Sequence, residues 1–189
     1  MAGFKTKVTP EIEKLTDICR DNTSLDLSLY AKYDVKRGLR DINGKGVLAG
    51  LTQVSNVQAT KMVDGKEVPC AGKLSYRGYN IKDLTKGFIQ DDRYGFEEVA
   101  YLLLFGKLPD KQQLMDFTEL LANQRSRPTN FVRDVIMKAP SKDIMNGLSR
   151  SVLTLYSYDH NPDDTSLPNV LRQCLTLISV FPLLSVYGY

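Results

Sequence analysis

The sequence has one histidine, three cysteines and no tryptophan. A single imidazole excludes a histidine-rich metal site, and we expect no bound metal. Cys19, Cys70 and Cys174 are far apart and odd in number. This pattern fits neither a disulfide framework nor a CxxC site, and it indicates a reducing compartment. The sequence also lacks a Walker-type phosphate loop, a GxGxxG after a strand and a GxSxG elbow, so three common catalytic frameworks are excluded.

The single histidine, His160, stands in the stretch YDHNPDD beside several aspartates. One imidazole with carboxylates at irregular spacing matches no metal-ligand pattern. We therefore interpret His160 as a loop histidine between two helices rather than as a base or a metal ligand.

The charges are balanced, with 25 basic and 22 acidic residues and a net charge of +3. No extended basic cluster is present, so we expect no nucleic-acid partner. The N-terminus, MAGFKTKVTPEIEK, lacks the apolar stretch of a signal peptide, and its acidic residues argue against a transit peptide. Together with the unpaired cysteines, this predicts a cytoplasmic protein.

Residues 173–189 are nearly apolar and carry no charge. The stretch is shorter than the roughly 20 residues that a membrane span needs, and Pro182 lies inside it. We expect a buried helix and no membrane partner. A chain that ends on such a helix also suggests a truncated protein or an intimate oligomer.

The periodicity predicts a mainly α protein with a small antiparallel β element near residues 47–79. Helices are expected over 9–19, 81–87, 95–106, 109–125, 128–139, 142–158 and 169–180, with a short one over 26–33. Thr9, Asn80 and Ser141 are the expected N-caps, and Gly87 is expected to end its helix. Residues 95–106 are apolar on all sides and predict a fully buried helix. The β-prone pieces are VLAGLTQVSNVQATKMV, KEVPC and KLSYR, and Asp64-Gly65 between the first two predicts a two-residue hairpin.

Three arginines lie in glycine-rich surroundings, where the backbone can approach an anionic ligand closely: Arg37, Arg40 and Arg77. For Arg77 in YRGY, the alternative is a strand-end arginine that stacks between Tyr76 and Tyr79 and pairs with Asp83. Spacing alone favours this structural interpretation.

Three motifs in order carry a family resemblance: GKGVLAGLTQVSNV, then GKLSYRGYNIKDL, then FEEVAYLLLFGKLPDKQQLMDF. They resemble the N-terminal part of a citrate synthase of bacterial type, in detail over about residues 44–117. The resemblance implies that residues 1–43 are an N-terminal helical extension. Residues 44–189 would then be the N-terminal part of the helical large domain, truncated before the catalytic region.

Citrate synthases are homodimers that condense acetyl-CoA with oxaloacetate to citrate and CoA, without a metal or redox cofactor. The resemblance implies this reaction for the parent enzyme. The family's catalytic aspartate, its two catalytic histidines and its oxaloacetate-binding arginines match no position here, so we assign no catalytic residue. Arg37 and Arg40 remain candidates for a contact with a CoA phosphate or with a second subunit.

The sequence leaves three interpretations open. The first is a citrate synthase fragment that is inactive alone. The second is a fragment of a 2-methylcitrate synthase, which uses propionyl-CoA. The third is a non-catalytic helical module that self-associates through an apolar face.

Overall fold

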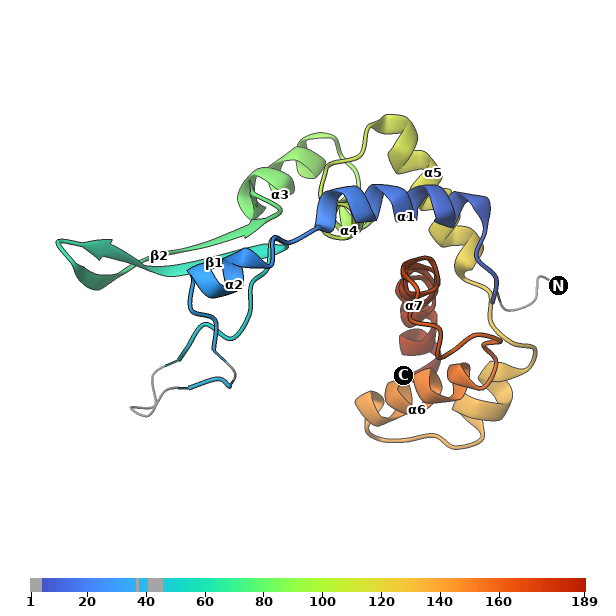
Figure 1. Ribbon diagram of the computed structural model, residues 1–189. Coiled ribbons are helices and arrows are strands. Elements are labelled where there is room, and N and C mark those ends of the chain that lie inside the picture. The colour runs from blue at the N-terminus through green and yellow to red at the C-terminus, as the bar shows by residue number, and fades with distance from the viewer. Residues whose placement is uncertain (1–4, 37, 41–45) are drawn as a thin grey trace. The chain divides into compact units, whose positions relative to one another are not determined.

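The computed structural model describes residues 5–36, 38–40 and 46–189 (Figure 1). These residues form two compact units. One unit comprises Met1–Asp17 and Lys111–Tyr189, and the other comprises Ile18–Asp110. Helices predominate in the described residues and accompany one three-stranded antiparallel sheet, which confirms the predicted fold class. The predicted domain boundary between residues 43 and 44 lies outside the described residues and stays a prediction.

Helix α1 (Pro10–Thr23) runs from the first unit into the second. Its start follows the prediction, because Thr9 Oγ1 accepts a hydrogen bond from Ile12 N at 3.4 Å. Glu11 and Glu13 lie in the first turn, where the positive end of the helix dipole stabilises carboxylates. The short helix α2 (Ser28–Lys32) follows.

The sheet of the Ile18–Asp110 unit has the strand order β1 (Ser55–Val63), β2 (Lys66–Tyr76), β3 (Tyr79–Asn80). The turn between β1 and β2 is at Asp64-Gly65, with φ of 49° and 76°, as the sequence predicted. Two details were wrong. Residues 47–54 form no strand, because β2 already ends at Tyr76, opposite Ser55, and offers them no partner. The pieces KEVPC and KLSYR belong to one continuous strand, with an irregularity in the ladder between Gln58 and Thr60.

Helix α3 (Ile81–Gln90) begins directly after β3. Asn80 is its N-cap, as predicted, since its side chain accepts a hydrogen bond from Lys82 N at 2.9 Å. The helix does not end at Gly87. It continues to Gln90, and the Gly87 carbonyl accepts a hydrogen bond from Asp91 N. A glycine ends a helix only where it takes a left-handed conformation, and Gly87 does not.

Helix α4 (Phe96–Phe105) ends at Gly106, which has a φ of 77°. Its buried residues are Tyr101, Leu102 and Phe105. The prediction of a helix buried on all sides was wrong at its start, because Phe96 is 58% exposed. The apolar composition of α4 therefore overestimates how much of the helix surface is buried within the Ile18–Asp110 unit.

The other unit is built from α5 (Lys111–Gln124), a short π-helix (Val132–Met137), α6 (Ile144–Tyr156) and α7 (Leu167–Gly188). Four buried residues, one directly before the π-helix, one in α6 and two in α7, form a core: Phe131, Leu155, Val180 and Leu184. The segment 128–139 was predicted as an α-helix, but its residues Val132–Met137 form the π-helix instead. The cap of α6 is Asp143, whose Oδ1 accepts from Asn146 N, and not Ser141.

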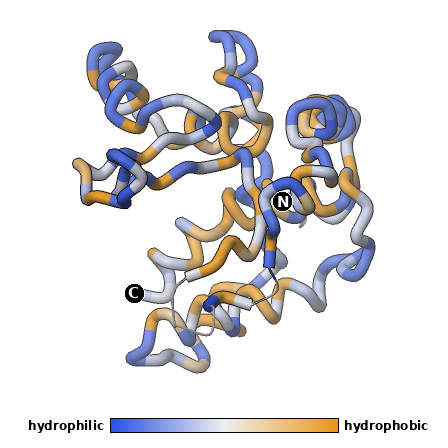
Figure 2. The backbone as a smooth tube through the Cα atoms, turned by 60° about the vertical axis from the view of Figure 1, so that its left-hand side comes forward, coloured by the Kyte–Doolittle hydropathy of each residue, from blue (hydrophilic) through white to orange (hydrophobic). Residues whose placement is uncertain are grey.

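Helix α7 is longer than the predicted 169–180. Pro168 lies in its first turn, where the missing N–H costs nothing, and Pro182 lies inside it. The helix that leads to the C-terminus is predominantly hydrophobic in Figure 2. By length and composition alone, α7 is the one helix in the described ranges that could cross a membrane; 39% of its 18-residue apolar window is buried within the structure.

Candidate functional site

Arg77 occupies the turn between β2 and β3. Arg77 and Gly78 have φ of 48° and 88°, the left-handed conformation that a two-residue hairpin turn requires. The guanidinium donates to one oxygen twice: Nε and Nη2 lie 3.2 and 2.9 Å from the carbonyl oxygen of Leu103. This carbonyl is among the last four of α4, which have no partner inside the helix. Arg77 therefore joins the sheet to the end of α4.

This geometry confirms the structural interpretation of YRGY and corrects the predicted partner. The guanidinium binds a backbone carbonyl and not the Asp83 carboxylate. The backbone of Arg77 is also fixed, because its N–H donates to Val54 O at 2.9 Å. With Nε and Nη2 both directed at Leu103 O, one of the edges by which the guanidinium could hold a ligand phosphate or carboxylate is already in use.

The other two candidate arginines lie in the segment before the sheet. Arg37 is outside the described residues. Arg40 is exposed, and its backbone forms an isolated antiparallel bridge with Gly46. Their role in binding CoA stays a prediction.

A buried ion pair in the other unit was not predicted. Arg172 of α7 is 1% exposed, and its Nη2 lies 2.6 Å from Oδ2 of Asp159, in the loop between α6 and α7. The remaining donors are also used: Nε lies 2.9 Å from Asn169 Oδ1, and Nη1 lies 3.4 Å from Lys5 O. The guanidinium thus ties together α7, the loop and the N-terminal segment.

The pKa of Asp159 reflects two opposed effects. Burial disfavours the charged carboxylate and would raise its pKa, but hydrogen bonds from Arg172, from Asn161 N and from Gln173 outweigh it. The net result is a lowered pKa, so Asp159 is ionised at neutral pH. A cavity of about 150 Å³ adjoins the pair, but the two charges satisfy each other. We therefore assign the cluster to structure and not to ligand binding.

A sequence signal for this cluster existed. Arg172 lies on the same helical stripe as Leu175, Thr176 and Ser179, all of which are buried. A charged residue within a buried stripe must find a partner of opposite charge. The sequence could not identify which of the acidic residues between 159 and 164 that partner is.

His160 is exposed and lies in the loop after α6, as predicted. The carboxyl groups around it have other partners: Asp163 accepts from Tyr156 Oη at 2.8 Å, and Asp164 accepts from Ser166 N at 2.9 Å. In the part of the chain that the structure describes, no three His, Cys, Asp or Glu side chains are grouped to hold a metal ion.

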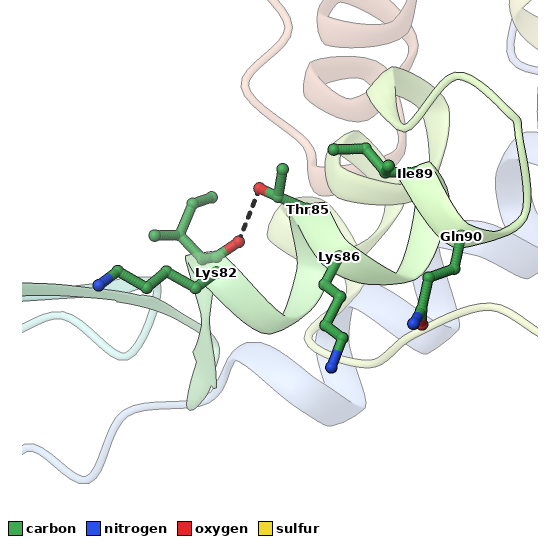
Figure 3. A pocket seen from close by; sticks show the side chains of 6 residues that line it. Lys82, Thr85, Lys86, Ile89 and Gln90 are labelled. Atoms are coloured by element: carbon green, nitrogen blue, oxygen red, sulfur yellow. Dashed lines mark hydrogen bonds between the residues drawn. The ribbon is translucent and has the colours of Figure 1, made fainter.

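An open depression of about 410 Å³ lies along α3 (Figure 3). It is lined from Ile81 to Gln90, with Lys82 and Lys86 at its side and the apolar side chain of Ile89 at one end. The Thr85 hydroxyl donates to Ile81 O and is not free to act on a ligand. Its charged lining residues are the two lysines, and no carboxylate or imidazole lines it to form an acid–base pair with them.

Comparison with known proteins shows which family the chain resembles. A family profile for the citrate synthase C-terminal domain matches residues 39–189. The citrate synthase of Saccharolobus solfataricus is 32% identical over 62% of this chain, and 2-methylcitrate synthase 2 of Corynebacterium glutamicum is 28% identical over 83%. A solved citrate synthase from Pyrobaculum aerophilum superimposes on 82% of the chain with a TM-score of 0.60 and 25% identity.

The matches cover 28% and 36% of the two curated relatives and 39% of the solved structure. The chain thus spans about a third of the length of these proteins. Because the family profile covers most of the chain, the assignment does not depend on one short motif. The chain belongs to the citrate synthase family.

Proposed function

We propose that this chain is part of an enzyme that condenses acetyl-CoA with oxaloacetate and releases citrate and CoA. The observation that carries the proposal is the family match over residues 39–189, which includes the YRGY turn and α4. In the reaction that the resemblance implies, a general base removes a proton from the acetyl methyl group. Hydrogen-bond donors then stabilise the developing enolate. This chemistry requires no metal or redox cofactor.

We further propose that the 189-residue chain does not catalyse this reaction by itself. The implied mechanism uses two histidines and an aspartate. This sequence has one histidine, which is exposed in a loop whose aspartates have structural partners. On this proposal the catalytic residues belong to the portion of the relatives that the chain does not match.

The similarity to 2-methylcitrate synthases supports a second candidate substrate. Several relatives are 2-methylcitrate synthases, including one from Shewanella oneidensis that is 31% identical over 61% of the chain. The alternative proposal is that propionyl-CoA replaces acetyl-CoA. Acetyl-CoA and propionyl-CoA differ by one methylene group, and a pocket discriminates only modestly between such substrates. Both thioesters must therefore be compared directly.

Three further properties belong to the same proposal. The active enzyme is a homodimer, it acts in the cytoplasm, and it has neither a nucleic-acid nor a membrane partner. The competing proposal from another class is a non-catalytic helical module that self-associates, supported by the exposed apolar side chains of Phe181 and Val186 on α7.

The test is an assay of CoA release with a thiol reagent. The 189-residue chain and the product of the complete gene are purified from a host that lacks citrate synthase. Each is assayed with oxaloacetate and either acetyl-CoA or propionyl-CoA, and the product is identified by mass spectrometry. A citrate synthase of known activity serves as the positive control, and omission of oxaloacetate detects simple thioester hydrolysis.

The expected result is activity from the complete gene product and none from the 189-residue chain. The ratio of kcat/KM for the two thioesters then decides between citrate and 2-methylcitrate. Citrate formation by the 189-residue chain refutes its proposed inactivity. Silence of both proteins with both thioesters refutes the enzymatic proposal and favours the self-associating module.

A further inference from the structure

A pocket of about 270 Å³ lies within the unit that contains α7. It is lined by the π-helix, the loop after it, α6 and the C-terminal end of α7, which packs beside α6 (Figure 1). Val135, Ile136 and Leu184 form an apolar wall that is continuous with the core cluster. One water molecule occupies about 30 Å³ of liquid, so the pocket has room for a ligand of about nine heavy atoms.

Two side chains of opposite charge line this pocket, Asp143 and Arg150. Asp143 is the N-cap of α6, and Arg150 follows about two turns later on the same face of the helix, roughly 10 Å along its axis. Within the described ranges, neither side chain forms a salt bridge with the other or with a third residue. Both charges are therefore available to a ligand in the pocket.

The guanidinium of Arg150 is only partly satisfied. Its Nη2 donates to Ala139 O at 2.6 Å. Its Nε is buried and has no hydrogen-bond partner among the residues that the structure describes. A buried donor without an acceptor costs free energy, and nearly all such groups in native proteins are satisfied. The missing partner is an acceptor oxygen, and a carboxylate suits a guanidinium best.

Gly147 lies in the pocket wall between the two charged residues, on the same face of α6. A Cβ on Gly147 would meet no atom within 4 Å, so the backbone there is open to the pocket. The nearby Ser151 is 3% exposed, and its hydroxyl donates to Gly147 O at 2.8 Å. The space between Asp143 and Arg150 is therefore left clear by a residue that has no side chain.

We propose that this pocket binds a free α-amino acid with an apolar side chain of about the size of leucine. The carboxylate of the ligand is the acceptor for Arg150, its ammonium group pairs with Asp143, and its side chain packs on the apolar wall. A ligand with only a carboxylate would bring its charge near Asp143 without compensation, and a ligand with only an amine would do the same near Arg150. A zwitterion satisfies both charges. The inference does not depend on the proposed enzymatic activity.

The first experiment titrates the 189-residue chain with ligands and follows the backbone amide shifts by NMR. Leucine is compared with 4-methylpentanoate, which lacks the ammonium group, with 3-methylbutylamine, which lacks the carboxylate, and with glycine, which lacks the side chain. We expect saturable binding of leucine with shifts at Gly147 and Arg150. Each of the other three ligands should bind roughly tenfold more weakly or worse, because each loses one of the three contacts.

Two charge variants test the assigned contacts. Arg150→Met removes the guanidinium but keeps a long side chain, and should weaken leucine binding by roughly tenfold or more. Arg133→Met is the matched control, because Arg133 pairs with Asp134 outside the pocket. Asp143→Asn keeps the N-cap, since asparagine can also accept from Asn146 N, but it removes the negative charge. It should weaken leucine binding and leave 4-methylpentanoate binding equal or stronger, a change of preference that a purely structural role would not produce.

Gly147→Leu separates loss of binding from loss of folding. Leucine is a better helix former than glycine, and its Cβ meets no atom, so the urea midpoint should not fall. Its side chain extends into the pocket, so leucine binding should be lost.

Each outcome decides the proposal. Saturable leucine binding that Arg150→Met and Gly147→Leu weaken, with the changed preference in Asp143→Asn, supports it. The absence of saturable binding at millimolar leucine overturns it. Equal affinity for leucine and 4-methylpentanoate overturns the zwitterion and leaves a simple carboxylate site. Leucine binding that is unchanged in both Arg150→Met and Gly147→Leu overturns the proposal as well, because the ligand then binds elsewhere.

Discussion

Removal of the Asp159 carboxylate should strongly destabilise the unit that contains α7. Arg172 is 1% exposed and the Asp159 side chain 9%, so Asp159→Ala leaves a buried guanidinium without its counter-charge. Breaking a buried pair from one side costs about 3–5 kcal/mol. Because Asn169 Oδ1 and Lys5 O still accept from Arg172, we expect the lower end, about 3 kcal/mol.

The assay is urea unfolding followed by far-UV circular dichroism, since the chain has no tryptophan to report on packing. The double variant Asp159→Ala, Arg172→Met is the decisive comparison. If the cost arises from an unpaired buried charge, the double variant is more stable than Asp159→Ala alone. An Asp159→Ala variant that loses less than about 0.5 kcal/mol, the usual range for surface substitutions, refutes the reasoning.

The same pair predicts an acid dependence. The folded-state pKa of Asp159 lies below its ordinary value of 3.8. A depressed carboxyl pKa stabilises the fold above the unfolded-state pKa, and this stabilisation is lost as the pH falls through the folded-state value. Stability should therefore decline below about pH 4, and the part of the decline that is absent in Asp159→Asn is the contribution of this carboxylate.

Three other predictions concern separate parts of the chain. Arg77→Lys keeps the charge but loses the two-pronged contact with Leu103 O, and should cost about 1–2 kcal/mol in urea unfolding, whereas a ligand-binding role would leave stability unchanged. Gly65→Ala places a Cβ at a φ of 76° and should cost about 1–2 kcal/mol, measured as faster amide exchange in the hairpin. Asp134 should titrate near pH 2 by NMR because Arg133 and Lys138 bind its carboxylate; in Arg133→Gln the pKa should rise, and an unchanged value would show that the contact does not form in solution.

The sequence predicted those features that depend on neighbouring residues. The Asp64-Gly65 turn and the Asn80 cap each need only a few consecutive residues, and the structure confirms both. The end of α3 was wrong for an informative reason. A glycine permits a left-handed conformation but does not impose one, and the helix continues through Gly87 because its backbone stays helical.

Features that depend on distant residues could not be predicted in the same way. The ladder irregularity between Gln58 and Thr60 is a property of two strands in register, not of either strand alone. The partner of Arg172 lies 13 residues away in a loop that offers several aspartates, and its third contact is with Lys5, 167 residues away. The identity of such a partner depends on how α7 packs against other segments, and the hydrophobic periodicity of one helix carries no information on that packing.

Arginine shows most clearly why residue type and a glycine-rich setting do not establish a binding site. The guanidinium fork that binds a phosphate or a carboxylate ligand binds a helix carbonyl or a buried aspartate equally well. The guanidinium groups of Arg77 and Arg172 both donate to oxygen atoms of this chain. For each of them, the structural interpretation follows from the identity of that acceptor. The same criterion applies to Arg40. Its assignment to a CoA phosphate requires a demonstration that its guanidinium meets an oxygen of the ligand in the bound state. The test is an Arg40→Lys variant of the complete gene product, which would raise the KM for the thioester without changing kcat if that contact exists.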